Sequence, residues 1–151
     1  MSEEFNHQSI TAGLQTWWSD QFPLSVQTIY PGMTIDTSTI DEWMDLKIDT
    51  WSRKPQRATG KRLINFSMTV HCFVKPAIET YRIQTLVDAA RKTLSQQNIP
   101  VRDYDNSGSP VVGYARLIEI EVRDLSRNDL NSNKHNLHHV AISSSGIAQE
   151  L

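Results

Sequence analysis

The chain has 151 residues, a length typical of one domain that buries a hydrophobic core of its own. With 38% hydrophobic and 21% charged residues and a formal net charge of −2, it is neither a disordered chain nor a typical nucleic-acid-binding protein, which is usually basic overall. No apolar run approaches the roughly 20 residues that span a bilayer, and residues 1–6 lack the apolar region of a secretory signal. We therefore expect one domain, residues 1–151, made in the cytoplasm, with its single cysteine, Cys72, buried and inert.

The first half of the chain predicts a helix, a short strand and a long β-hairpin. Apolar residues recur at helical spacing over residues 9–21. Residues 24–30 follow as a short strand that stops at the turn Pro31-Gly32. From residue 41 to 74, two arms alternate apolar and polar side chains, which predicts a hairpin with one face on the core.

The second half predicts a helix over residues 81–97 and strands over 101–104, 111–124 and, weakly, 139–147, whereas the tail from Gly146 should fray. Alternation in the long strand predicts one shared face for three apolar residues, Ile118, Ile120 and Val122. This order of elements predicts an α+β fold, a mostly antiparallel sheet with a long β-hairpin and two helices packed on one face.

The connection between the hairpin arms is basic. No acidic residue occurs from Thr50 to Ile78, whereas residues 33–49 hold five acids and one lysine. Five cations fall within ten residues, namely Arg53, Lys54, Arg57, Lys61 and Arg62. Two interpretations stay open: a solvated hairpin whose arms partly neutralise each other, or charge complementarity between subunits.

Two tryptophans add to this candidate interface. Trp43 and Trp51 share the polar face of their arm with Asp45, Lys47 and Asp49. Exposed tryptophans on a charged face are typical of interface anchors. The alternative is that the arm changes faces at a bulge, which would move one indole to the core.

Residues 103–108 match the first positions of a calcium-binding loop. A glutamate is needed at position 12 of such a loop, and that position is Tyr114. The flanking segments also resemble strands rather than helices. We expect a plain tight turn here.

The histidines suggest no metal site. His135, His138 and His139 lie in an asparagine-rich segment without helical periodicity, and on a strand the last two point to opposite faces. His7 and His71 have no evident partner. Phosphate-binding glycine motifs, nucleophile elbows and C-x-x-C are absent from the sequence. We expect no catalytic residue, no metal, no cofactor and no enzyme, with a small metal-dependent enzyme as the remote alternative.

The order of elements resembles the tail terminator (tail completion) proteins of long-tailed bacteriophages. The resemblance is carried by the N-terminal helix, the Pro31-Gly32 turn, the basic hairpin and the helix that ends Arg91-Lys92-Thr93-Leu94. The strand Pro100–Tyr104 and the long strand ending Glu121–Asp124 fit the same plan. The resemblance covers roughly residues 8–147, rests on the pattern of elements rather than a short motif, and leaves the histidine-containing C-terminal segment unmatched.

This resemblance implies a structural protein of the virion. In that family a hexameric ring caps the finished tail tube, stops its polymerisation and joins the tail to the head or neck. The implied partners are further copies of the chain, the tail tube protein, the neck or head-closure protein and the sheath protein of a contractile tail. DNA passes through the lumen without sequence-specific binding, and no membrane is involved. Assembly would take place in the host cytoplasm. A neck or head-closure protein is the alternative that the sequence leaves open.

Overall fold

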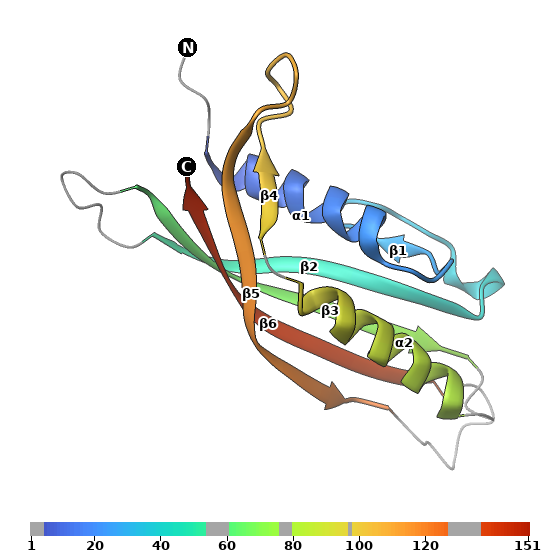
Figure 1. The fold of residues 1–151 in the computed structure, drawn as a ribbon. Helices are drawn as coiled ribbons and strands as arrows, with labels where there is room; N and C mark the ends of the chain where they lie inside the picture. Colours follow the sequence, from blue (N-terminus) through green and yellow to red (C-terminus); the bar gives the residue numbers. More distant parts are fainter. Residues whose placement is uncertain (1–4, 54–60, 76–79, 97, 127–136) are drawn as a thin grey trace.

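A computed structural model describes residues 5–53, 61–75, 80–96, 98–126 and 137–151. Two helices lie on one face of a six-stranded sheet whose strand order is β1-β2-β3-β6-β5-β4 (Figure 1). The helices are α1 (His7–Gln21) and α2 (Thr80–Leu94), with a short 3-10 helix, η1 (Thr37–Thr39). The strands are β1 (Thr28–Ile29), β2 (Glu42–Arg53), β3 (Leu63–Val74), β4 (Ile99–Arg102), β5 (Val111–Asp124) and β6 (His138–Glu150).

The expected α+β fold with a mostly antiparallel sheet is wrong. The sheet is mixed, because β1 runs parallel to β2 through the pairs Thr28↔Met44 and Ile29↔Asp45. Strands make up 46% of the described residues and helices 26%, so the molecule is mostly β, with a curled half-barrel sheet. Alternation in a sequence shows which side chains share a face, but it does not show which neighbour a strand pairs with or in which direction.

The core lies between the helices and the inner face of the sheet, which is the face turned toward them. Asn6 and Ser9 start α1 with a capping box, in which each side chain bonds the other residue's backbone N–H. Trp18 is fully buried and its Nε1 donates to the Thr28 hydroxyl at 3.1 Å, which ties α1 to β1. The largest fully buried side chains are Phe5, Ile10, Leu14, Trp18, Met44, Leu46, Ile64, Met68, Leu86, Leu94, Ile99 and Ile142.

The weakly predicted strand over 139–147 is a central strand, and it continues to Glu150 through the tail that was expected to fray from Gly146. β6 pairs along its whole length with β3 and lies between β3 and β5 (Figure 1). Its serines, alanines and glycine have weak strand propensity, which explains why the sequence pattern predicted it only weakly. Gly146 is needed because it lies opposite Phe66, and a Cβ at this position would overlap the Phe66 ring.

Two bulges change which side chains face the core. The register of β2 shifts between Asp49 and Trp51, and that of β5 shifts between Ile118 and Glu121. Beyond its bulge β5 turns over, so Val122 pairs with the buried Ile142 on the inner face, whereas Ile118 pairs with Ser145 on the outer face. The expectation of one shared face for Ile118, Ile120 and Val122 is therefore wrong. A bulge inserts one residue and so reverses the alternation.

We predict that Gly146→Ala destabilises the fold by about 1–3 kcal/mol, the usual cost of overpacking a filled core. The reason is that the added methyl must displace the Phe66 ring against the buried inner face. The measurement is urea unfolding followed by tryptophan fluorescence. Ser145→Ala, one residue away on the outer face, is the matched control and should change stability by less than about 0.5 kcal/mol. Equal stabilities of the two variants would contradict the role given to Gly146.

Candidate interaction surface

At each side of the sheet, the short outermost strand pairs with only part of its long neighbour. β4 pairs with β5 as far as Ala115, and no described strand lies beside residues 116–124 on that side. We call this stretch the β5 open edge. At the other end β1 pairs with β2 only at Met44 and Asp45, which leaves residues 46–53, the β2 open edge, without a strand neighbour in the described chain. Unpaired backbone groups of this kind are a template for a strand from another molecule.

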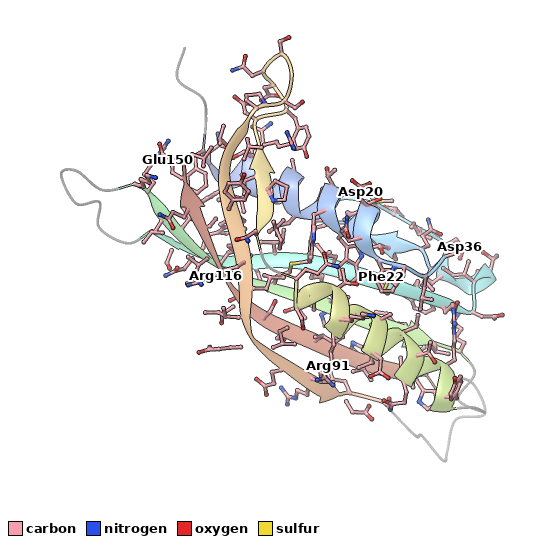
Figure 2. All side chains as sticks on the ribbon, viewed as in Figure 1. Asp20, Phe22, Asp36, Arg91, Arg116 and Glu150 are labelled. Atoms are coloured by element: carbon pink, nitrogen blue, oxygen red, sulfur yellow. The ribbon has the colours of Figure 1, made fainter. Side chains whose placement is uncertain are left out.

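The side chains of both open edges are accessible. On β5, Ile118 is 36% and Val122 43% exposed, and the charged residues around them are exposed as well. Arg116, labelled in Figure 2, marks where this edge begins. On β2, Lys47 and Asp49 are exposed. Each edge therefore offers free backbone groups together with charged side chains, and that of β5 adds exposed apolar ones.

An aromatic row crosses the outer face of the sheet, the face turned away from the helices. Trp43, Phe73 and His139 lie directly opposite one another on β2, β3 and β6. Their ring centroids are 5.0 Å and 4.3 Å apart, in stacked geometry. Lys75 Nζ lies 5.2 Å from the Trp43 ring centroid and donates to the Thr37 carbonyl at 2.6 Å. This row joins three strands and the loop that carries η1.

His71 and His139 form a hydrogen-bonded pair within this row, with Nδ1 and Nε2 separated by 2.8 Å. One ring must donate and the other must accept, which requires at least one neutral imidazole. Burial lowers the pKa of His71, and Lys47 lowers it further, against the opposing effect of Asp45 and Asp49. The expectation that His71 has no partner is wrong, because the two histidines are 68 positions apart and meet only through the pairing of β3 with β6.

Neither of the two tryptophans that were predicted as interface anchors is exposed on the charged face. Trp43 lies on that face but is only 8% exposed, because Phe73 and Lys75 cover it. Trp51 follows the β2 bulge and lies on the inner face, partly buried against Phe66 and stacked on His7 at 4.3 Å. The alternative that the arm changes faces at a bulge is thus confirmed for Trp51.

The structure describes only part of the basic hairpin connection. Arg62 forms an ion pair with Glu150, Nε to Oε2 at 2.5 Å, and this hydrogen bond holds the pKa of Glu150 below its ordinary value. Lys61 is exposed. Arg53 ends β2 with its backbone paired to Ile64, while two further cations, Lys54 and Arg57, lie outside the described residues. One of the five cations is therefore neutralised within the chain, and the interface role of the others stays a prediction.

Two of the five neighbouring acids also act within the chain. Glu42 binds Arg82 through two hydrogen bonds of 2.6 Å, which lower the pKa of Glu42 and raise that of Arg82. Asp36 (Figure 2) caps η1 by accepting from the backbone N–H and the hydroxyl of Ser38, and these bonds lower its pKa. Sequence reasoning missed Arg82, which is 40 positions from Glu42 and carries no local signal of the pair.

A groove of about 370 Å³ lies beside the start of the β5 open edge. Its lining includes the side chains of Asn65, Tyr114, Arg116 and Gln149, and the Asn65 Oδ1 atom is buried without a hydrogen-bond partner. The described residues that line it include no acid, histidine or cysteine. Amide, phenol and guanidinium groups suit binding of another polar surface, because none of them is a nucleophile or a general base near neutral pH.

The calcium-like segment is a tight turn between β4 and β5. The Asp103 carboxylate accepts from the backbone N–H of Asp105 at 3.1 Å, and the Asn106 N–H donates to the Asp103 carbonyl. Within the described ranges no group of three or more histidine, cysteine or acidic side chains is placed to hold a metal. The carboxylate of Asp103 thus serves the turn itself.

Other candidate groups are accounted for by packing. His138 and His139 lie on opposite faces of β6, as predicted, and His135 lies outside the described residues. Cys72 is fully buried, and burial raises the pKa of its thiol to about 12, which confirms the expectation of an inert cysteine. His7, expected to lack a partner, instead stacks on Trp51.

No protein-family model matches the chain, and no curated protein matches it in sequence. Among the described helices, none is long and apolar enough to cross a membrane.

We predict that the free energy of unfolding falls as the pH drops below about 6.5, the ordinary pKa of histidine. The folded-state pKa of His71 is depressed, so the unfolded chain binds the proton more readily, and acidification favours unfolding until the folded His71 is protonated too. Urea unfolding between pH 5 and 8 measures this. His71→Gln should flatten the dependence, whereas His7→Gln, outside the pair, should retain it. An unchanged pH dependence in His71→Gln would contradict the assignment.

Proposed function

We propose that the protein is a structural subunit that assembles into a ring, and that it acts as the tail terminator of a long-tailed bacteriophage. The observation that carries this proposal is the pair of open edges at opposite ends of the sheet. The two edges differ from each other, so a contact between them joins copies head to tail. A repeated contact of this kind closes into a ring when the rotation between copies allows it.

The remaining surface chemistry supports an assembly role. The inner face is filled by the helices, and the outer face carries an aromatic row, serines, a threonine and a polar groove without a reactive group among its described residues. Open strand edges invite uncontrolled pairing, and ring closure satisfies them.

The proposal includes the partners that the resemblance implies. Copies of the chain, six in that family, would form the ring. The tail tube protein would bind one side of it and the neck or head-closure protein the other, with a sheath protein around a contractile tail. DNA would pass the lumen without sequence readout, since phosphate contacts carry none. The exposed Lys61 in the basic connection would then lie at a subunit contact or at the lumen. The protein would reside in the tail or neck of the virion.

The test is electron microscopy with mass measurement, on the purified protein alone and mixed with tail tubes of the same phage. We predict rings, or tubes of limited length capped at one end. Ile118→Lys places a charge on the β5 open edge, where the side chain is already 36% exposed. It should abolish ring formation and tube capping without unfolding the protein. Tyr81→Lys, on α2 with 75% exposure, is the matched control and should assemble normally.

A protein that stays monomeric and also fails to cap tubes would overturn the proposal. Binding to the neck end of filled heads instead of to tubes would favour the alternative, a neck or head-closure protein. The same open edges fit that role, so only the identity of the bound particle separates the two.

A further inference from the structure

The two open edges lie at the same levels of the sheet. The pairing of the four long strands can be followed from β2 through β3 and β6 to β5. Residues that are paired from strand to strand form a row across the sheet. One row on the outer face consists of Lys47, Thr69, Ser143 and Glu121. The next row on the inner face consists of Leu46, Val70, Ile142 and Val122. A residue of β2 and its counterpart on β5 therefore share a height along the strands, although they lie at opposite ends of the sheet.

The short edge strands leave matching gaps. β1 ends its pairing at Asp45, which is level with Arg123 of β5. β4 begins its pairing at Ala115, which is level with Arg53 of β2. Between these limits, residues 46–52 and 116–122 have no strand neighbour in the described part of the chain over the same levels, and each stretch contains one bulge.

The strand directions fit a continued sheet. Each neighbouring pair from β2 through β3 and β6 to β5 is antiparallel, so β5 runs antiparallel to β2. A second copy in the same orientation would therefore set its β2 antiparallel to the first copy's β5, as a hairpin neighbour would be. After Val122, β5 would leave the sheet plane beside β1 of the second copy.

We propose that the β5 open edge of one copy binds the β2 open edge of the next as an antiparallel strand pair, with Lys47 opposite Glu121. This strand pair, the joint, specifies how neighbouring copies would contact each other in the ring, and it rests on the proposed function. It unites two stretches of equal length, and β4 of one copy and β1 of the other close its ends. The contact is head to tail and so propagates from copy to copy.

Charge complementarity selects this register. Lys47 meets Glu121, which brings opposite charges together on the outer face within the joint. On the inner face, the exposed Val122 lies beside Leu46 and loses its contact with water. A shift by two residues in the direction of Asp124 would instead place Lys47 near Arg123, an unfavourable pair of like charges.

The first experiment exchanges the charges. We expect Lys47→Glu and Glu121→Lys each to weaken self-assembly at least tenfold, alone or on tail tubes, whereas the double variant recovers it. Both side chains are exposed, so the fold should be kept, which circular dichroism checks. Lys92→Glu, exposed on α2, is the matched control. Single variants that assemble like the wild type, or a double variant without recovery, would overturn this register.

The second experiment separates the register from the ring itself. Proteins carrying Lys47→Cys and Glu121→Cys are mixed, with tail tubes added, and oxidised; Cys72 is buried and does not interfere. We expect a disulfide-linked dimer that contains one protein of each kind, and none from Asp49→Cys mixed with Glu121→Cys. Rings without the Lys47–Glu121 link would overturn the register and leave the proposed function standing. A link between two Glu121→Cys copies alone would mean a two-fold contact and would overturn it as well. A mixture that neither forms rings nor caps tubes would overturn both proposals.

Discussion

The whole sheet depends on the pairing of β6 with its two neighbours. β6 is the only described connection between the β2–β3 hairpin and the β5–β4 pair, so without it the sheet would consist of two separate halves. From Ser144 through Gly146 to Ala148 its inner face is built from small residues, and Phe66 fills the space above Gly146 that a larger side chain would need. An aromatic ring over a strand glycine offsets the missing side chain, and the backbone here is protected from water on both sides by neighbouring strands.

The two bulges lie on either side of one level of the sheet and shape its edges. The register shifts follow Asp49 on β2 and Ile118 on β5, which are joined through Ser67 and Ser145. Each bulge increases the local twist, and together they fit the curled sheet. At an edge a bulge also opposes pairing with an arbitrary strand, because only a strand with a compatible irregularity keeps its hydrogen bonds. A bulge on each edge thus favours one specific partner over many nonspecific ones.

Sequence patterns predicted the elements with strong periodicity and failed where other constraints decided. The α1 and α2 stripes and the alternation of β3 follow from burial of one face, so they are visible locally. β6 was predicted only weakly and too short, because its position between β3 and β5, not its propensity, makes it a strand. The face of Val122 was missed, and that of Trp51 stayed open between two alternatives, because a bulge leaves no mark in an alternating pattern.

The candidate surface was harder to predict than the elements. The predicted interface consists of five cations and two tryptophans. The prediction rests on the density of the cations and on the alternation of the hairpin arm, and neither pattern takes account of partners from distant segments. Arg62 and Glu42 both find such partners, Glu150 and Arg82, and Trp43 is covered by Phe73 and Lys75. The open edges carry no compositional signal at all, because they result from the shortness of β1 and β4.

Because of these internal ion pairs, the charges available for contacts with other molecules differ from those that the sequence suggests. The hairpin and its flanking acids dominate the sequence, yet Arg62 and Glu42 are neutralised inside the chain. Lys47, Glu121 and Arg123 are exposed along the two open edges, where free backbone groups are available for pairing. Hydrogen bonds between edge strands supply affinity without selectivity, whereas opposite charges at matched levels distinguish one register from the next. An assembling subunit needs both, and in this chain both occur on the same seven-residue stretches of β2 and β5.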